Sequence, residues 1–207
     1  MSDLWQQLNG EMATIIANVR RSLVQISNGR GGVGAGTIWH ADGLIVTNAH
    51  VLAGRDHLNV TLPDQRTLPA RLLAVDPEHD LAALSVSATG LVTIELSEAP
   101  SLVPGQWVLA LGHPWGVLGA VTAGTVIDVG VPPEIARSRG EFIQVGLHLR
   151  PGHSGGPLVD VHGRLVGINT MIAGPDVGLA IPLHVVKAFL RQTLGSPGPA
   201  TPSTEYI

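Results

Sequence analysis

Ser154 is the residue of this chain best placed to act as a nucleophile, because it lies in the glycine-rich segment Gly152-His153-Ser154-Gly155-Gly156-Pro157-Leu158. Glycines let a loop turn tightly and direct successive N–H groups at one point. Such a loop can present a serine hydroxyl beside an oxyanion hole built from the N–H groups of Gly152 and Ser154. On its own, the segment indicates only a turn.

Two upstream segments supply the groups that a serine nucleophile needs. His50 lies in Thr47-Asn48-Ala49-His50-Val51, and Asp80 begins Asp80-Leu81-Ala82-Ala83-Leu84. A serine hydroxyl requires a base, and imidazole has an unperturbed pKa of about 6.5. A carboxylate can fix the imidazole tautomer, and the order His, Asp, Ser is a known order of catalytic triads. We therefore predict His50 as base, Asp80 as its orienting group and Ser154 as nucleophile.

Each of these three residues also has a structural interpretation. His50 alone would be a histidine at a strand end, Asp80 a cap of the turn before the next strand, and Ser154 a turn serine. Their joint occurrence in this order, each at a junction of strand and loop, favours the catalytic interpretation.

The elements that must position these residues are mostly short strands. The 207 residues are 44% hydrophobic and 14% charged, and the 26 glycines and 15 prolines are dispersed between apolar runs, which is typical of a β-rich fold with many turns. This pattern favours a sandwich or barrel over alternating strands and helices. We expect strands at 23–27, 37–40, 44–47, 59–62, 71–75, 81–86, 92–96, 106–111, 121–129, 141–145, 157–160, 164–170 and 177–181.

Two helices are expected at the ends of this β region. Apolar residues recur at helical spacing over residues 3–20, and again over 183–194 after Pro182. The first helix either packs on its own domain or contributes an oligomer contact. Residues 195–207 are rich in Pro, Ser, Thr and Gly and are expected to form a flexible tail.

Composition excludes several classes of function. The net charge is −4 without a Lys/Arg cluster, so nucleic acid is not expected as a partner. There are no cysteines, and the nine histidines lack metal-ligand spacing, so we expect no disulfide, metal or other cofactor. No apolar run approaches the ~20 residues that span a bilayer. No signal peptide is visible, which predicts a cytoplasmic protein, or a periplasmic or extracellular one if a leader has been removed.

Over about residues 22–194 the chain resembles the HtrA (high-temperature requirement) branch of the trypsin-like serine proteases. The segments around His50, Asp80 and Ser154 are similar to the histidine, aspartate and serine motifs of that branch. Further similar stretches are residues 112–116 with 121–126, 166–170 and 177–182.

The resemblance implies an all-β fold of the trypsin/chymotrypsin type, a double β-barrel with six strands in each barrel. We expect an N-terminal helical segment over 1–21, barrel one over about 22–96, a linker over 97–105 and barrel two over about 106–181. His50 and Asp80 would come from the first barrel and Ser154 from the second.

The resemblance also implies a serine endopeptidase that cleaves unfolded or flexible polypeptides through an acyl-enzyme. A substrate strand would pair with the edge formed by Ile168, Asn169, Thr170 and Met171. Homo-oligomers are expected, most often trimers that involve the N-terminal segment. The alternatives are a catalytically silent protease-fold module that binds peptides and an enzyme that processes only its own terminus.

The chain departs from the HtrA pattern at two histidines. His153 replaces the asparagine that usually precedes the nucleophile, and we favour a solvent-facing substitution without catalytic effect, although its backbone shapes the oxyanion hole. His148, six residues before Ser154, replaces a small apolar residue near the base of the S1 pocket. There it would narrow the pocket or favour a polar or acidic P1 side chain; alternatively, it points to solvent.

The family usually continues into a PDZ domain, whereas only 13 residues, 195–207, follow the last expected helix. We therefore expect the protease domain alone. The tail ends in Ile207, and an apolar end with a free carboxylate can dock in a peptide groove. A further hypothesis places this tail in an active-site cleft, its own or a neighbour's; the alternative is a disordered tail.

Overall fold

Two closed barrels of six antiparallel strands make up most of the chain. The computed structural model describes residues 2–29, 33–54, 57–99, 102–132, 140–174 and 176–195. The first barrel has the strand order β1-β2-β3-β6-β5-β4, and β4 pairs with β1 to close it. Its strands are β1 (Leu23–Ser27), β2 (Val33–Ile38), β3 (Leu44–Thr47), β4 (Leu58–Thr61), β5 (Thr67–Asp76) and β6 (Leu81–Val86).

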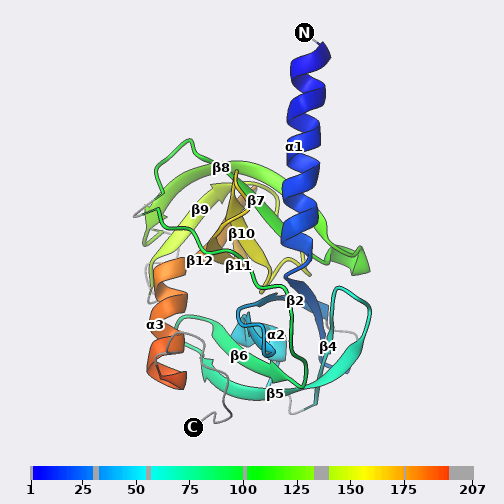
Figure 1. Cartoon of the computed structure of the whole chain (residues 1–207). Helices are drawn as coiled ribbons and strands as arrows, with labels where there is room; N and C mark the ends of the chain where they lie inside the picture. Colours follow the sequence, from blue (N-terminus) through cyan, green and yellow to red (C-terminus); the bar gives the residue numbers. More distant parts are fainter. Residues whose placement is uncertain are drawn as a thin grey trace.

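The second barrel repeats this architecture with the strand order β10-β11-β12-β9-β8-β7, and β7 pairs with β10 to close it. Figure 1 shows it above the first barrel. Its strands are β7 (Trp107–Gly112), β8 (Ala120–Gly130), β9 (Phe142–Gly146), β10 (Pro157–Asp160), β11 (Leu165–Gly174) and β12 (Val177–Pro182). The expected double β-barrel is therefore confirmed.

Four helical segments complete the described part of the fold, and two of them were not predicted. The expected helices are α1 (Ser2–Arg20) and α3 (Leu183–Leu194); the additional ones are α2 (Ala49–Leu52) and the 3₁₀ turn η1 (Pro114–Gly116). The short segments lack the repeated apolar spacing that reveals a longer helix. Helix α3 contacts β5 and β6 of the first barrel and β11 and β12 of the second, along the left side in Figure 1.

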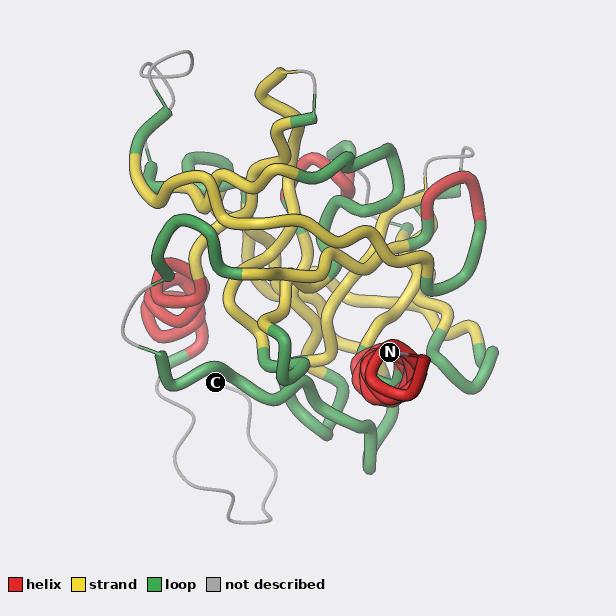
Figure 2. Tube along the Cα trace, turned by 90° about the horizontal axis from the view of Figure 1, so that it is seen from above, coloured by secondary structure: helices red, strands yellow, loops and turns green. Residues whose placement is uncertain are grey.

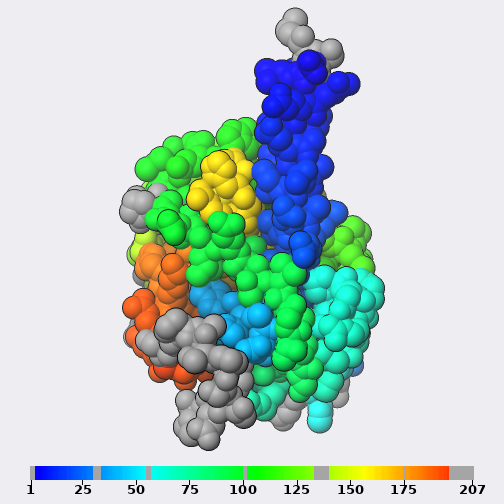
Figure 3. Space-filling view, viewed as in Figure 1, coloured from blue at the N-terminus to red at the C-terminus, as the bar shows by residue number. Residues whose placement is uncertain are grey.

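Helix α1 packs on the body only through its C-terminal half. Met12, Ile15 and Ile16 contact the core and Val19 is buried, whereas Leu4, Trp5 and Leu8 are exposed. The space-filling view shows the first turns standing clear of the body, and the view along the helix shows it at the side of the barrels (Figures 2 and 3). No helix of the described ranges combines the length and the apolar character that crossing a membrane requires.

Strand β6 illustrates how one apolar strand contributes to two separate cores. Successive side chains point to opposite faces of a strand. Ala82, Leu84 and Val86 fill the interior of barrel one, whereas Leu81 and Ala83 join the cluster between the barrels. Because both faces are covered, the strand reads as a continuous apolar run. A third cluster, which includes Val108, Val145 and Leu158, fills barrel two.

One expected strand is absent. Residues 92–96 form no strand: they make an isolated bridge between Leu96 and Leu165, and the Ile94 N–H donates to the Ile38 carbonyl oxygen at 3.1 Å. Each barrel is already closed by six strands, so no free edge remains to pair with this apolar stretch. It belongs to the connection between the barrels. The loop residues 30–32 and the tail residues 196–207 lie outside the described residues.

Candidate active site

His50 and Asp80 meet at the end of barrel one. His50 lies on α2, directly after β3, and Asp80 directly precedes β6, which pairs with β3. His50 Nδ1 lies 2.7 Å from Asp80 Oδ2, and the N–H of His50 donates to Asp80 Oδ1 at 3.0 Å. The Asn48 side chain donates to the Asp80 carbonyl oxygen at 3.0 Å. These contacts explain why Asn48, His50 and Asp80 occur where they do in the two segments.

The carboxyl group of Asp80 is held in its ionised form. Burial by itself raises the pKa of Asp80, but hydrogen bonds from His50 and from the Thr170 hydroxyl outweigh it and hold the pKa below its usual value. Thr170 Oγ1 donates to Asp80 Oδ2 at 2.6 Å. Asp80 also has a positive φ of 54°, a backbone conformation that aspartate tolerates better than most residues. A carboxylate fixed in this way orients the His50 ring.

The turn that precedes Ser154 runs from Arg150 to His153. The N–H of His153 donates to the Arg150 carbonyl oxygen at 2.9 Å, with Pro151 second in the turn and Gly152 third at a φ of 106°. This combination is typical of a type II turn, which requires glycine at the third position. Within the described ranges, the N–H groups of Gly152 and Ser154 donate to no acceptor. Both are therefore available to an oxyanion, while His153 shapes the turn.

Ser154 and His50 line the same pocket, which has a volume of about 270 Å³. The Ser154 hydroxyl donates to the carbonyl oxygen of Thr170 at 2.9 Å, so it must turn away from Thr170 to give its proton to His50. Sequence reasoning missed several apolar or cationic residues of this pocket, because they lie outside the matched motifs: Leu149, Arg150, Pro151 and Ile172.

The expectation that His153 faces solvent is wrong. Its side chain is only 3% exposed, and Nδ1 lies 3.1 Å from both the N and the O of Arg150. Burial lowers the pKa of the His153 imidazole. His153 therefore holds the turn together from inside, a role that the short polar side chain of asparagine could also perform.

His148 does not lie at the base of the pocket beside Ser154. Side chains alternate along this segment, so Leu147 and Leu149 are buried while His148 is exposed. His148 Nδ1 lies 2.5 Å from Asp176 Oδ1, and His148 is not among the residues that line the pocket. The structure therefore corrects the prediction of a polar S1 base, and the solvent-facing alternative describes this side chain.

The proposed substrate edge begins later than expected. Ile168 pairs with β10 on one side and with β12 on the other, and Asn169 exchanges hydrogen bonds with the backbone of residues 155 and 156. Both residues are fully buried. They have no free edge for a substrate strand, whereas Met171 and Ile172 are exposed and line the pocket. The available edge of β11 therefore starts at Thr170.

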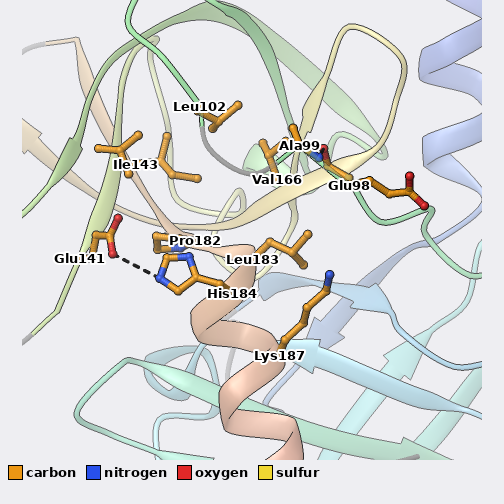
Figure 4. A pocket seen from close by; sticks show the side chains of 12 residues that line it. Glu98, Ala99, Leu102, Glu141, Ile143, Val166, Pro182, Leu183, His184 and Lys187 are labelled. Carbon is orange, nitrogen blue, oxygen red and sulfur yellow. Dashed lines mark hydrogen bonds and ion pairs between the residues drawn. The ribbon is translucent and has the colours of Figure 1, made fainter.

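A second pocket, of about 240 Å³, lies away from these residues at the start of α3 (Figure 4). Its base is apolar, and Glu141 and His184 pair across its rim at 3.2 Å. None of the predicted site residues lines it. Among the described residues there is no group of three or more side chains that could hold a metal ion.

Comparison with known proteins agrees with the double-barrel fold. The trypsin-like peptidase domain family matches residues 34–168, from β2 to the middle of β11. This range covers most of both barrels and contains His50, Asp80 and Ser154. The chain belongs to the trypsin-like peptidase family.

Within that family, the similarity is to the HtrA branch. A probable periplasmic serine endoprotease, DegP-like, of Ectopseudomonas mendocina is 41% identical over 186 residues, which are 83% of this chain and 39% of the relative. The mitochondrial serine protease HTRA2 of Drosophila pseudoobscura pseudoobscura is 36% identical over 77% of this chain and 38% of its own length. The chain thus spans about two fifths of these relatives.

A solved structure, described as the HtrA-type protease AlgW with tripeptide, superposes with a TM-score of 0.82 at 32% identity. The match covers 89% of this chain and 63% of that one. The predicted resemblance to the HtrA branch is confirmed by these comparisons.

Proposed function

We propose that this chain is a serine endopeptidase in which Ser154 is the nucleophile, His50 the general base and Asp80 the group that orients His50. The observation that carries the proposal is the His50–Asp80 hydrogen bond of 2.7 Å beside a pocket that Ser154 shares with His50. One relative named a serine endoprotease and another named a serine protease support this activity.

The reaction begins when a peptide carbonyl lies over Ser154 with its oxygen toward the N–H groups of Gly152 and Ser154. The Ser154 hydroxyl leaves the Thr170 carbonyl, gives its proton to His50 and attacks the carbonyl carbon. Asp80 stabilises the imidazolium that forms, and the two N–H groups stabilise the oxyanion. His50 then protonates the leaving amine, and water hydrolyses the acyl-enzyme by the same steps in reverse.

The substrate is an unfolded or flexible polypeptide that adds a strand to the edge of β11 from Thr170 onward. Strand addition takes its affinity from main-chain hydrogen bonds and is therefore open to many sequences. The exposed side chains of Met171 and Ile172 and the buried Leu149 give the pocket an apolar wall. This wall suits an apolar P1 side chain.

In this proposal the compartment follows a relative's name, and the assembly follows from the exposed apolar face of α1. A relative named as periplasmic supports the periplasmic alternative and gives no support to the cytoplasmic expectation. A homo-oligomer, in which the exposed Leu4, Trp5 and Leu8 of α1 contact another copy, would cover the apolar face that the body leaves open. Light scattering after size exclusion tests this assembly, and a monomer at micromolar concentration contradicts it.

One experiment tests the activity. Purified wild type and Ser154→Ala are compared on casein and on internally quenched peptides, with Ser87→Ala, at an exposed serine after β6, as the matched control. A fluorophosphonate probe is expected to label Ser154 in the wild type and in Ser87→Ala. Turnover and labelling that do not exceed those of Ser154→Ala would favour the peptide-binding module, in which the hydroxyl stays on the Thr170 carbonyl.

A further inference from the structure

Arg150 and Trp115 form an exposed cation–π pair next to the nucleophile turn. The guanidinium carbon of Arg150 lies 4.8 Å from the centroid of the Trp115 ring, and Trp115 is 73% exposed. Among the described residues, no acidic side chain pairs with Arg150. A guanidinium that lies over an indole ring can keep its edge N–H donors free for another acceptor. The pair is therefore prepared to bind a carboxylate.

The backbone of Trp115 keeps its ring on the outside of the loop. Trp115 has a φ of 52° and a ψ of 25° within the 3₁₀ turn η1, a left-handed conformation that is uncommon for a bulky residue. His113, which directly precedes η1, is anchored because its N–H donates to the Gly152 carbonyl oxygen at 2.8 Å. Such strain is retained only where the surroundings hold it, and it often accompanies a binding role.

The position of the pair relative to Ser154 indicates which part of a substrate it meets. The nucleophile turn lies between two segments: the N–H of Gly155 donates to Asn169 of β11, and Gly152 accepts from His113 before η1. If the substrate residues before the scissile bond pair with β11, the substrate chain therefore continues over Gly152 toward Trp115. The residues that follow the scissile bond would lie on Trp115 and Arg150.

The charge around Arg150 favours an acidic substrate residue after the scissile bond. Arg150 is the only arginine or lysine among the residues that line the pocket beside Ser154, and no aspartate or glutamate lines it. The neighbouring surface is apolar, with Val117 and Leu118 exposed beyond Trp115. A single free cation at the border of an apolar surface attracts a carboxylate more strongly than it would in open water.

We propose that Arg150 and Trp115 form a specificity subsite for an acidic side chain at the first or second residue after the scissile bond. The inference rests on the proposed endopeptidase function and extends it to the substrate class. A contact that only fastens η1 to the nucleophile turn is the competing explanation.

The test uses internally quenched peptides that are identical except for Glu, Gln or Lys at each of those two positions. For the wild type, kcat/KM is expected to be about five- to tenfold higher with Glu than with Gln at the preferred position, lowest with Lys, and to lose part of this ratio in 0.5 M salt. Arg150→Gln is expected to bring the Glu:Gln ratio to about one. Arg150→Lys, which keeps the charge but not the planar fork, is expected to retain only part of it.

The matched control is Arg71→Gln, which removes the same charge from an exposed position on β5 and is expected to keep the wild-type ratio. Equal cleavage of the Glu and Gln peptides by the wild type would overturn the subsite while leaving the endopeptidase intact. A Glu preference that survives in Arg150→Gln would also overturn it. Cleavage of every peptide at the level of Ser154→Ala would overturn both proposals together.

Discussion

The hydroxyl of Thr170 donates a 2.6 Å hydrogen bond to Oδ2 of Asp80, and this bond joins the two barrels at the proposed catalytic site. The same residue receives the Ser154 hydroxyl on its carbonyl oxygen at 2.9 Å. One residue of β11 thus contacts both Asp80 from the first barrel and Ser154 from the second.

Thr170→Val removes the hydroxyl while keeping the size and the branched shape of the side chain. A hydrogen bond to a charged group contributes about 1.5–3 kcal/mol, so kcat/KM is expected to fall roughly 10- to 100-fold. Thr170→Ser, which keeps the hydroxyl, should stay within a few fold of the wild type. A Thr170→Val enzyme within twofold of the wild type on quenched peptides would show that the bond does not orient the site.

The residue types within short segments made much of this site predictable. The placement of the remaining side chains depends on how the segments fold in three dimensions. His50, Asp80 and Ser154 stand in segments whose residue types suggest their roles. By contrast, the burial of His153 depends on how the 150–153 turn folds back on itself, which no local pattern records. His148 was more accessible to reasoning, because Leu147 and Leu149 alternate with it and indicate an outward side chain.

The fold was predictable because local residue patterns indicate most strands. The prediction was wrong for one strand, where the outcome depends on the rest of the fold. Strands such as Leu81–Val86 and Leu44–Thr47 were predicted with their observed bounds, because apolar residues fill them and turn residues flank them. The stretch 92–96 has the same composition as a strand. It lacks a free strand edge to pair with, because both barrels are closed. Closure of the barrels is not visible in the local sequence pattern.

Stability is expected to fall in mild acid because of His113. This residue is buried, and burial lowers the pKa of its imidazole to about 4, whereas a histidine in the unfolded chain titrates near 6.5. Below pH 6.5, His113 is protonated in the unfolded chain but stays neutral in the folded chain. The resulting decrease in the free energy of unfolding grows as the pH falls from 6.5 toward 4 and then levels off. It reaches about 2 kcal/mol at pH 5.

Urea unfolding at pH 7.5 and pH 5.0 measures this dependence. His113→Asn keeps a polar acceptor for the N–H of Gly119, which bonds His113 Nδ1 at 3.2 Å, but removes the titrating group. Its free energy of unfolding should fall less between the two pH values than that of the wild type. The control is His57→Asn at an exposed position, and an equal pH dependence in all three proteins would contradict the prediction.

Arg20 at the end of α1 is linked to the oxyanion turn through a short series of hydrogen bonds. Arg20 Nε donates to Gly119 O at 2.7 Å, the Gly119 N–H donates to the His113 ring, and the His113 N–H donates to Gly152 O. Arg20→Met keeps the length of the side chain and breaks the first bond. We expect kcat/KM to fall several fold while the free energy of unfolding changes by less than about 1 kcal/mol.

Arg21→Met is the control for this series, because the Arg21 side chain makes none of these contacts while the residue lines the same surface pocket as Arg20. It should keep wild-type kinetics. An equal decrease in kcat/KM in the two variants would mean that the positive charge near this pocket affects activity, and that the hydrogen-bond connection to Gly152 does not.

At Gly155, barrel one packs directly against the loop that carries Ser154. Its φ is 84°, and a Cβ there would overlap the Ala35 carbonyl oxygen and the Thr47 hydroxyl. The Ala35 N–H also donates to the Ser154 carbonyl oxygen at 2.8 Å, so any shift of this contact moves Ser154. Gly155→Ala is therefore expected to lower the free energy of unfolding by at least about 2 kcal/mol and to abolish most activity.

The matched control, Gly10→Ala, is expected to have the opposite sign. Gly10 lies in the middle of α1, where a methyl group in place of its hydrogen would meet nothing within 4 Å, and alanine favours a helix over glycine by up to about 1 kcal/mol. Chemical denaturation and peptide turnover on both variants check the pair. A Gly155→Ala protein as stable and as active as the wild type would mean that the barrels can separate locally without moving Ser154, and the close contact would then have no role in positioning the nucleophile.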